Sequence, residues 1–301
     1  MAVLATAGAA VADGDEKAAR AAEKAARAAK LAQAMAVVTF TKKIDQATDK
    51  ALKLQKAGDF KNAETQWNIV VDTYESGDDG VVISAQAIYR LGKSLALRAD
   101  TRSELGQRSK KEATLNAAID DYKRSLTIVE SAEVRVKLAT ILLIVKRDAE
   151  AEKEFDAVVE SDVGNQIKGR AYNNRGLVKQ QQGKWSEAVD DFQQAVSISQ
   201  GGSPEAMKNL ALAKFGAGDE AGSLTMMRQQ SKDMIFGVVE GAEDIPSALA
   251  AAEAATGDAL QAAKDFAKVQ DIRYKDVRFV TEGRLWPPRL VAGLQSLLPK
   301  P

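Results

Sequence analysis

The sequence contains no cysteine and no histidine among its 301 residues. These absences exclude a cysteine nucleophile, a serine–histidine–aspartate triad, an imidazole general base and a metal site built from thiolate or imidazole ligands. Only carboxylates, lysine, tyrosine and oxygen ligands remain for catalysis. We therefore expect a protein that is not an enzyme and that binds no cofactor and no metal ion.

Aromatic residues are scarce, at 5%, and neither sign of charge predominates, because 42 Lys and Arg residues balance 42 Asp and Glu residues. Nucleic-acid binding requires a basic face, so the overall charge gives no support for a nucleic-acid partner. The apolar stretch over residues 1–11 is too short to cross a bilayer, which takes about 20 residues. We expect a protein that binds no nucleic acid and does not span a membrane.

Alanine is abundant, and it favours helices packed closely through small side chains over strands. Residues 1–15 contain Ala10-Val11-Ala12, which resembles a signal cleavage site but lacks a basic region before it, so a signal remnant and a disordered tail are both open. Residues 16–43 form an alanine-rich helical extension with a basic stripe from Lys17 to Arg27. Its opposite face is alanine, which favours a solvated extension over a membrane-surface helix.

An internal repeat follows. A small residue precedes a large one by four positions in six segments, at intervals of 55, 33, 37, 35 and 39 residues: Ala63 and Trp67, Ala118 and Tyr122, Ala151 and Phe155, Ala188 and Phe192, Ser223 and Met227, and Ala262 and Phe266. The spacing predicts helix pairs of about 34 residues each, with small residues where paired helices approach closely. We expect left-handed glycines in the turns between paired helices, at Gly58, Gly183, Gly218 and Gly257.

One interval is longer than the others, which predicts an insertion at about residues 98–111. If Gly92 is the small residue of the first helix in that unit, about 14 residues between Leu97 and Glu112 must loop out. A solvated loop is the favoured interpretation, and a contact with a specific partner through Arg102 and Arg108 is the alternative.

The repeat resembles the tetratricopeptide repeat family. Seven residues match signature positions, whereas Arg175 and Gln200 depart from them; the matches are Tyr172, Gly176, Gly183, Trp185, Ala188, Phe192 and Ala195. The resemblance implies an all-α, right-handed α-solenoid of about six helix pairs over residues 44–270. The helical extension would precede this array, and a capping helix in residues 271–301 would cover its last unit around Phe266.

The C-terminal residues 274–298 carry a second resemblance, to the plant and algal tetratricopeptide proteins described as the chloroplast lumen common family. The matching residues are Tyr274-Lys275-Asp276, Phe279-Val280 and Trp286-Pro287-Pro288, and Leu285 separates Arg284 from Trp286. This resemblance implies a chloroplast thylakoid lumen location. A soluble stroma or a bacterial cytoplasm is the alternative.

Paired acidic residues could supply oxygen ligands for a metal ion or the two carboxylates of a glycosidase. Asp120-Asp121 and Asp190-Asp191 occupy the same place in the repeat, just before the packing aromatic. We therefore expect both pairs to be solvated repeat positions.

The resemblance to tetratricopeptide repeats implies that the first helix of each pair lines a concave groove. The partner-binding residues implied in this way are Tyr89, Lys93, Asn173, Leu177, Gln180, Lys208, Leu212 and Phe215. The set lacks the Lys, Asn and Arg cluster that clamps a terminal carboxylate, and it favours a peptide or helix with apolar side chains, whose backbone Asn173 and Gln180 would hold. Ordinary packing between repeats is the alternative for each residue.

We therefore expect a non-catalytic scaffold or adaptor that binds a protein partner. The second resemblance implies a role in the assembly or maintenance of a photosynthetic membrane complex, to which the protein would be peripheral. Two alternatives are a stably bound structural subunit of a large complex and a bacterial-type soluble adaptor.

Overall fold

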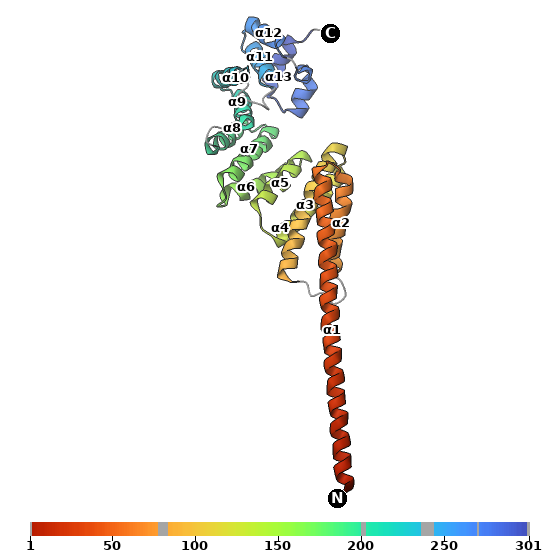
Figure 1. The fold of residues 1–301 in the computed structure, drawn as a ribbon. Helices are drawn as coiled ribbons and strands as arrows, with labels where there is room; N and C mark the ends of the chain where they lie inside the picture. The colour runs from red at the N-terminus through yellow and green to blue at the C-terminus, as the bar shows by residue number, and fades with distance from the viewer. Residues whose placement is uncertain (1, 78–83, 200–202, 236–243, 270, 300–301) are drawn as a thin grey trace. The chain divides into compact units, whose positions relative to one another are not determined.

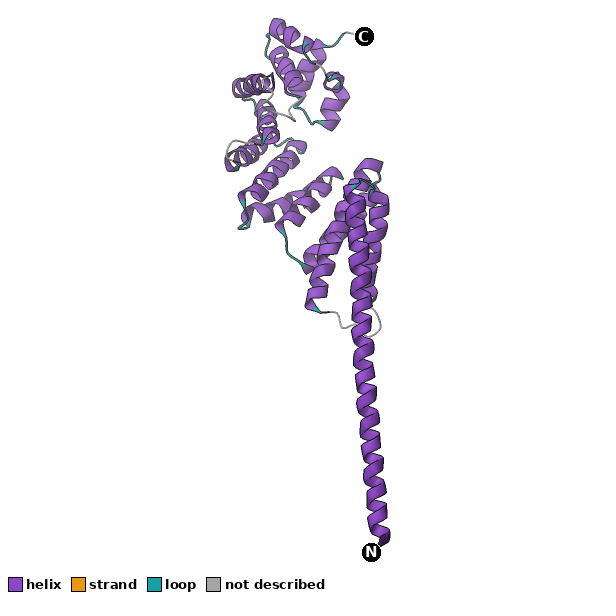
Figure 2. Ribbon diagram, in the orientation of Figure 1, coloured by secondary structure: helices purple, strands orange, loops and turns teal. Residues whose placement is uncertain are grey.

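The computed structural model describes the backbone of residues 2–77, 84–199, 203–235, 244–269 and 271–299, and side chains from residue 18 onward except residues 234 and 235. These ranges contain helices and no strands (Figures 1 and 2). The all-α prediction is confirmed. The chain divides into two compact units, unit 1 over residues 1–130 and unit 2 over residues 131–301.

Unit 1 consists of two helix pairs. Their helices are α1 (Ala2–Lys56), α2 (Phe60–Ser76), α3 (Ala85–Ser109) and α4 (Glu112–Ile128). Gly58 turns the chain between α1 and α2 with a φ of 76°, and the Asp59 side chain caps α2 by accepting a hydrogen bond of 3.2 Å from the backbone N–H of Asn62. Ala63 and Trp67 are fully buried, as the repeat predicts.

The N-terminal extension and the first helix of the repeat array are one helix. α1 runs without a break through residues 15 and 43, where we expected boundaries. For residues 2–15 the structure has a helix, where a disordered tail was one of the two expectations. The other expectation, a signal remnant, stays a prediction.

The expected loop at residues 98–111 is wrong, because α3 is a single helix of 25 residues that continues to Ser109. A Cβ added to Gly92 would touch Ile128, as one added to Gly169 would touch Ile198, so Gly92 corresponds to Gly169 and not to Gly176. Ala99 is then the counterpart of Gly176. The insertion is seven residues at the turn between α3 and α4, and it lengthens the end of α3 and the start of α4. The packing face is kept because the added residues lie beyond it.

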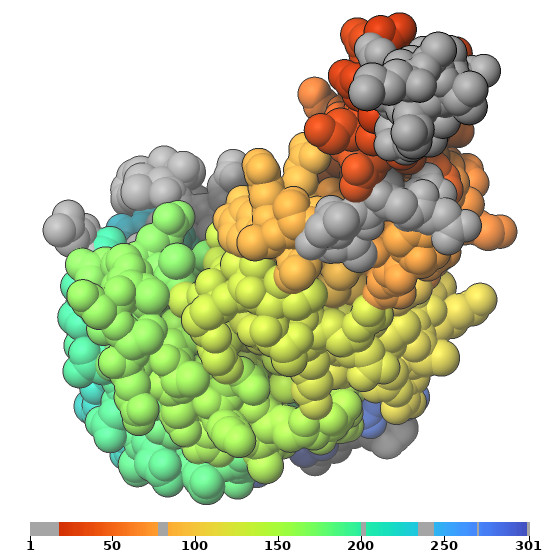
Figure 3. Space-filling view, turned by 90° about the horizontal axis from the view of Figure 1, so that it is seen from below, coloured from red at the N-terminus to blue at the C-terminus, as the bar shows by residue number. Residues whose placement is uncertain are grey.

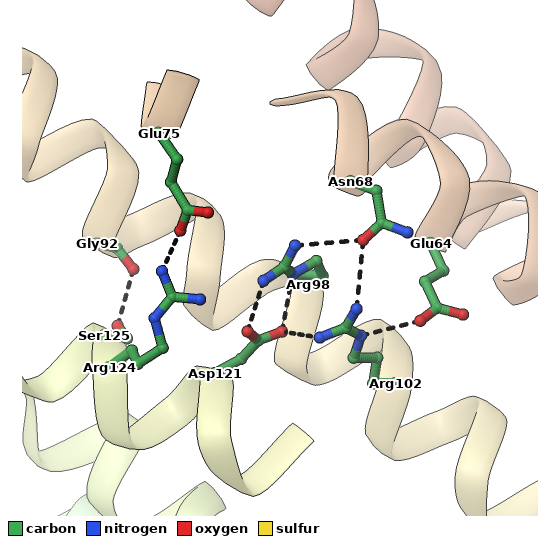
Figure 4. Close-up of polar contacts among 9 residues, drawn as sticks. All are labelled: Glu64, Asn68, Glu75, Gly92, Arg98, Arg102, Asp121, Arg124 and Ser125. Atoms are coloured by element: carbon green, nitrogen blue, oxygen red, sulfur yellow. Dashed lines mark hydrogen bonds and ion pairs between the residues drawn. The ribbon is translucent and has the colours of Figure 1, made fainter. Parts of the chain in front are cut away.

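A buried ion network joins α2, α3 and α4 (Figure 4). The Asp121 carboxylate accepts hydrogen bonds from Arg98 Nη2 at 2.7 Å and from Arg102 Nη1 at 2.8 Å. Arg102 Nε also donates to Glu64 at 2.9 Å, and both guanidiniums donate to the side-chain oxygen of Asn68. Arg102 is therefore part of the helix framework, which contradicts its assignment to a solvated loop.

The same arrangement recurs in unit 2. Arg175 donates to Asp191 through two bonds of 2.9 and 2.6 Å, and to Asp156 on the preceding helix at 2.7 Å. Asp121 and Asp191 are each only 2% exposed, so the expectation that they are solvated is wrong. The first residue of each acidic pair, Asp120 and Asp190, is exposed.

Unit 2 continues the pairing over its described residues. Its helices are α5 (Ala132–Ile144), α6 (Asp148–Glu160), α7 (Asn165–Gln181), α8 (Trp185–Ile198), α9 (Pro204–Gly216), α10 (Glu220–Ile235), α11 (Ile245–Ala255), α12 (Ala259–Ala267) and α13 (Pro288–Leu297), with short helices η1 (Ile272–Lys275) and η2 (Phe279–Gly283). Gly183, Gly218 and Gly257 take positive φ at the turns, as predicted. The right-handedness of the array stays a prediction.

The C-terminal segment covers α9 and α11, the first helices of the last two repeats. α12 lies at the edge of the covered surface. Trp286, Leu290 and Leu294 are buried in one cluster with residues of α9 and α11, whereas Phe266 of α12 is only partly buried against it. The Cβ that Gly293 lacks would lie 2.0 Å from the backbone oxygen of Ala251, so α13 approaches α11 as closely as glycine allows. The expectation that the tail caps the array around Phe266 is corrected accordingly.

Candidate functional site

Unit 2 contains a cleft of about 540 Å³ on the side formed by its first helices. We call it the amide cleft. It is lined by Leu143, Ile144 and Lys146 at the end of α5; by Asn173, Asn174, Leu177 and Gln181 of α7; by Glu205, Lys208, Asn209 and Leu212 of α9; and by residues 282–285 of the tail. The wall thus combines three repeats with the C-terminal segment.

A row of side-chain amides crosses the cleft from α9 to α5. Asn209 Nδ2 donates to Asn173 Oδ1 at 3.0 Å, Asn173 Nδ2 donates to Asn174 Oδ1 at 3.1 Å, and Asn174 Nδ2 donates to Thr140 Oγ1 at 3.1 Å. The three asparagines are half-buried or buried. Each bond restrains the next side chain, so the polar groups facing the cleft have fixed orientations before any ligand arrives.

The tail closes one end of the cleft. Leu285 takes a φ of 54°, and its backbone oxygen accepts a hydrogen bond of 2.9 Å from Gln180 Nε2. A non-glycine residue in this region is strained, so the surrounding contacts must hold it there. Gln180 is 4% exposed.

Charge in the cleft is balanced within the protein. Three cations and two carboxylates line it, and the buried Asp244 is a third carboxylate; the charged lining residues are Lys146, Lys208, Arg284, Glu205 and Glu282. Asp244 is 1% exposed and lies 2.8 Å from Arg284 Nη2 and 3.7 Å from Lys208 Nζ. Burial disfavours the Arg284 guanidinium, but the Asp244 carboxylate outweighs this effect and raises the pKa of Arg284 above its usual value. The cleft therefore suits a neutral segment better than a free carboxylate.

The predicted groove residues separate into three groups. Asn173, Leu177, Lys208 and Leu212 line the amide cleft, although Lys208 and Leu212 are only 5% and 2% exposed. Gln180 binds the tail, and Phe215 is buried in the cluster that the tail covers, which corrects their assignment as partner contacts.

Tyr89 and Lys93 belong to unit 1. Both are exposed on α3, where Lys93 Nζ lies 5.0 Å from the centre of the Tyr89 ring. The assignment of Tyr89 and Lys93 to the groove treats Gly92 as the counterpart of Gly176. Since Ala99 is that counterpart, Tyr89 and Lys93 lie about two helical turns before the groove positions of α3.

Sequence reasoning missed Asn174, Asn209 and the tail residues 282–285. Asn209 follows Asn174 by 35 residues, which is one repeat, so the two asparagines occupy the same repeat position. That recurrence was a usable signal for the amide row. The position of the tail had no such signal.

No group of three or more acidic side chains in the described residues is placed to hold a metal ion, and no described helix is long and apolar enough to cross a membrane. The arrangement can bind through hydrogen bonds and apolar contacts.

Helices paired in this way define a helical-repeat protein. Comparison with known protein families identifies the type of repeat. The family described as Tetratricopeptide repeat matches residues 169–201, which include most of α7 and all of α8. PilW, a widely conserved type IV pilus biogenesis factor, has a similar structure, with a TM-score of 0.56 and 19% identity over 85% of this chain and 98% of PilW.

PilF of Pseudomonas aeruginosa is also similar, with a TM-score of 0.53 and 14% identity over 86% of this chain and 99% of that chain. MamA matches with a TM-score of 0.50 and 18% identity over 66% of this chain and 98% of MamA. No curated protein matches the chain in sequence. The chain therefore has a tetratricopeptide-repeat fold and carries a recognisable repeat at α7 and α8.

Proposed function

We propose that unit 2 holds a short segment of a protein partner in the amide cleft, so that the chain works as a non-catalytic scaffold. The observation that carries this proposal is the row of hydrogen-bonded side chains across three helices, in which asparagines of α7 and α9 connect to Thr140 of α5. Each asparagine has two N–H donors and an oxygen with two lone pairs, and the row uses only part of this capacity.

The remaining donors and acceptors match the groups of an extended backbone. Leu143 and Leu177 beside the row give apolar surface for alternate side chains of the bound segment. Neighbouring helix axes lie about 8–10 Å apart, so three helices span about 20 Å, which an extended chain covers in about six residues at roughly 3.3 Å each. The ligand is therefore a short, uncharged, extended segment.

The test measures binding of overlapping peptides, drawn from proteins that co-purify with the full chain. Asn173→Ala combined with Asn209→Ala should weaken the tightest peptide at least fivefold, since each removed hot-spot contact costs about 1 kcal/mol or more. The melting temperature should change little, because neither side chain is part of the apolar core.

Gln194→Ala is the matched control. Gln194 is an exposed amide on α8, outside the cleft lining, so its loss should leave binding unchanged. If the double asparagine variant binds as well as the parent, while charge reversal along Arg20, Lys24 and Arg27 abolishes binding, recognition lies outside the cleft.

We also propose a thylakoid lumen location and a role in the assembly or maintenance of a photosynthetic membrane complex. The support is the sequence of the tail, where Tyr274, Val280 and Trp286 are buried. Because these residues are buried, the motif stabilises the fold wherever in the cell the protein is located. Protease protection of the protein in intact thylakoids would support this proposal, and recovery in the stroma would contradict it.

The alternatives differ in how they purify. A stably bound structural subunit would remain with its complex at constant stoichiometry through a salt wash, whereas an assembly scaffold would be released. A bacterial-type adaptor would co-purify with soluble partners. The similarity of the fold to PilW and PilF is compatible with each of these roles.

A further inference from the structure

The N-terminal part of α1 presents an exposed helix surface. Every side chain from residue 18 to residue 39 is exposed except that of Ala36, which is partly buried. Among these residues are large apolar ones: Leu31 and Met35 are each 63% exposed, and Val38 is 66% exposed. Figure 1 shows α1 extending beyond α2, and Figure 3 views it from its N-terminal end.

The exposed apolar residues lie opposite the face that packs into unit 1. Phe40, Ile44 and Ala47 are buried against α2, and at about 100° per residue they fall on the far side of the helix from Leu31 and Val38. No contact with α2 therefore covers this side.

Charged residues continue the same line in both directions. Nine residues fall within an arc of about 80° at about 100° per residue, and we call them the outer stripe: Arg20, Lys24, Arg27, Leu31, Met35, Val38, Lys42, Asp45 and Asp49. The side chains of all nine are exposed. The stripe is basic at one end, apolar in the middle and acidic at the other end.

This order is self-complementary. A two-fold axis between residues 34 and 35 places Leu31 against Val38 of a second copy. It also places Lys24 against Asp45 and Arg20 against Asp49, so cations of each copy meet anions of the other. A two-fold contact repeats every pair twice. One like-charged pair, Arg27 with Lys42, accompanies them.

An anionic membrane surface fits the outer stripe less well than a second copy of the chain does. Asp45 and Asp49 share the face with the basic residues, and alanine occupies most of the adjoining surface. Asp45 lies 3.5 Å from Arg90, and its side chain is still 56% exposed, so a second cation can reach it. A helix that binds anionic lipid needs a larger apolar face and no acidic residues on it.

We propose that the outer stripe of α1 docks antiparallel against the outer stripe of a second copy of this chain. Leu31, Met35 and Val38 form the apolar centre, and Lys24–Asp45 and Arg20–Asp49 pairs flank it. The contact spans residues 20–49, about 45 Å of helix at 1.5 Å per residue. It leaves the amide cleft of each copy to its own ligand.

Sedimentation of the full chain at low salt should show a concentration-dependent dimer. Lys24→Glu should raise its dissociation constant about tenfold, because each dimer replaces two attractive pairs by two repulsive ones. Adding Asp45→Lys to this variant should restore dimerisation. Lys42→Glu should tighten the dimer several-fold, because it turns the like-charged pair into an attractive one.

Lys30→Glu is the control, since Lys30 is exposed on α1 outside the stripe. Circular dichroism should show the same helicity in all variants. The absence of native cysteine allows a direct test of direction. Met35→Cys near the axis should cross-link two copies under oxidation, whereas Lys24→Cys, far from the axis, should not.

Cross-linking through Lys24→Cys alone would indicate a parallel contact and overturn the proposal. A parent chain that stays monomeric up to about 1 mM would also overturn it. So would binding of the parent to vesicles of phosphatidylcholine and phosphatidylglycerol that Lys24→Glu abolishes, if the protein sediments as a monomer. Loss of dimer in Lys24→Glu without restoration by Asp45→Lys would reject the stated register.

Discussion

Replacing Asp121 with Asn tests the helix framework of unit 1. The carboxylate lies between two guanidiniums, 2.7 Å from Arg98 Nη2 and 2.8 Å from Arg102 Nη1. Asn has almost the same size, but it removes the negative charge and turns an N–H group toward one of these donors. Two cations then share a site without the anion that held them together.

The structure sets the expected magnitude. Two unit charges about 4 Å apart interact by roughly 4 kcal/mol at an effective dielectric constant of about 20. The Arg98 side chain is 7% exposed and has no second carboxylate among the described residues, whereas Arg102 is 17% exposed and keeps its ion pair with Glu64. We expect Asp121→Asn to lower the free energy of unfolding by about 3–5 kcal/mol, as for other buried pairs that lose one partner.

Urea unfolding followed by circular dichroism measures the loss, and hydrogen exchange of the α3 and α4 amides locates it. Asp120→Asn is the matched control, because Asp120 is the exposed neighbour. Adding Arg98→Met to Asp121→Asn should recover part of the stability, since it removes the uncompensated buried cation. If Asp121→Asn costs no more than Asp120→Asn, solvent compensates these charges and the reasoning is wrong.

Three further changes test unit 2. Burial raises the pKa of Glu253 above its usual value, so the folded state binds that proton more tightly than the unfolded state, and the ionised group reduces stability above its folded pKa. Glu253→Gln should therefore raise the urea midpoint at pH 7, by an amount that shrinks as pH falls; a constant or growing difference would contradict this. Gly293→Ala should push α13 away from the Ala251 oxygen and cost about 1–3 kcal/mol, measured by thermal unfolding, whereas the exposed Ser296→Ala should cost little. A chain ending before Tyr274 should aggregate or bind a hydrophobic dye, because it uncovers the apolar surface of α11; equal solubility and stability of the shortened chain would refute the covering role.

The helix pairs could be predicted from sequence because their packing rule is local. A small residue faces a large one four positions later, as with Ala188 and Phe192, and both are fully buried. Glycine at the turns has an equally local cause, since Gly183 and Gly218 need positive φ. These signals do not depend on what lies elsewhere in the chain.

The register of α3 could not be predicted in this way. Gly92 and Ala99 are both small and lie seven residues apart on one face, so either fits the packing rule. Only contacts with α4 distinguish them. The burial of Asp121 follows from the same register, because an acidic residue on a second helix is indistinguishable from a solvated one until its arginine is placed opposite.

The groove positions taken from the tetratricopeptide repeat family include residues that bind the tail and residues that line the open cleft. Gln180 lies on α7, one turn beyond Leu177, and such a position would usually meet a ligand; here it holds the Leu285 backbone oxygen. Its replacement would disturb the tail before any partner is considered, so a loss of binding in that variant would not locate the partner. Asn173 and Asn209 bond to neighbouring amides of the row, and they line the open cleft. The same tail that completes the apolar cluster of α9 and α11 thereby limits recognition to the part of the surface formed by α5, α7 and α9.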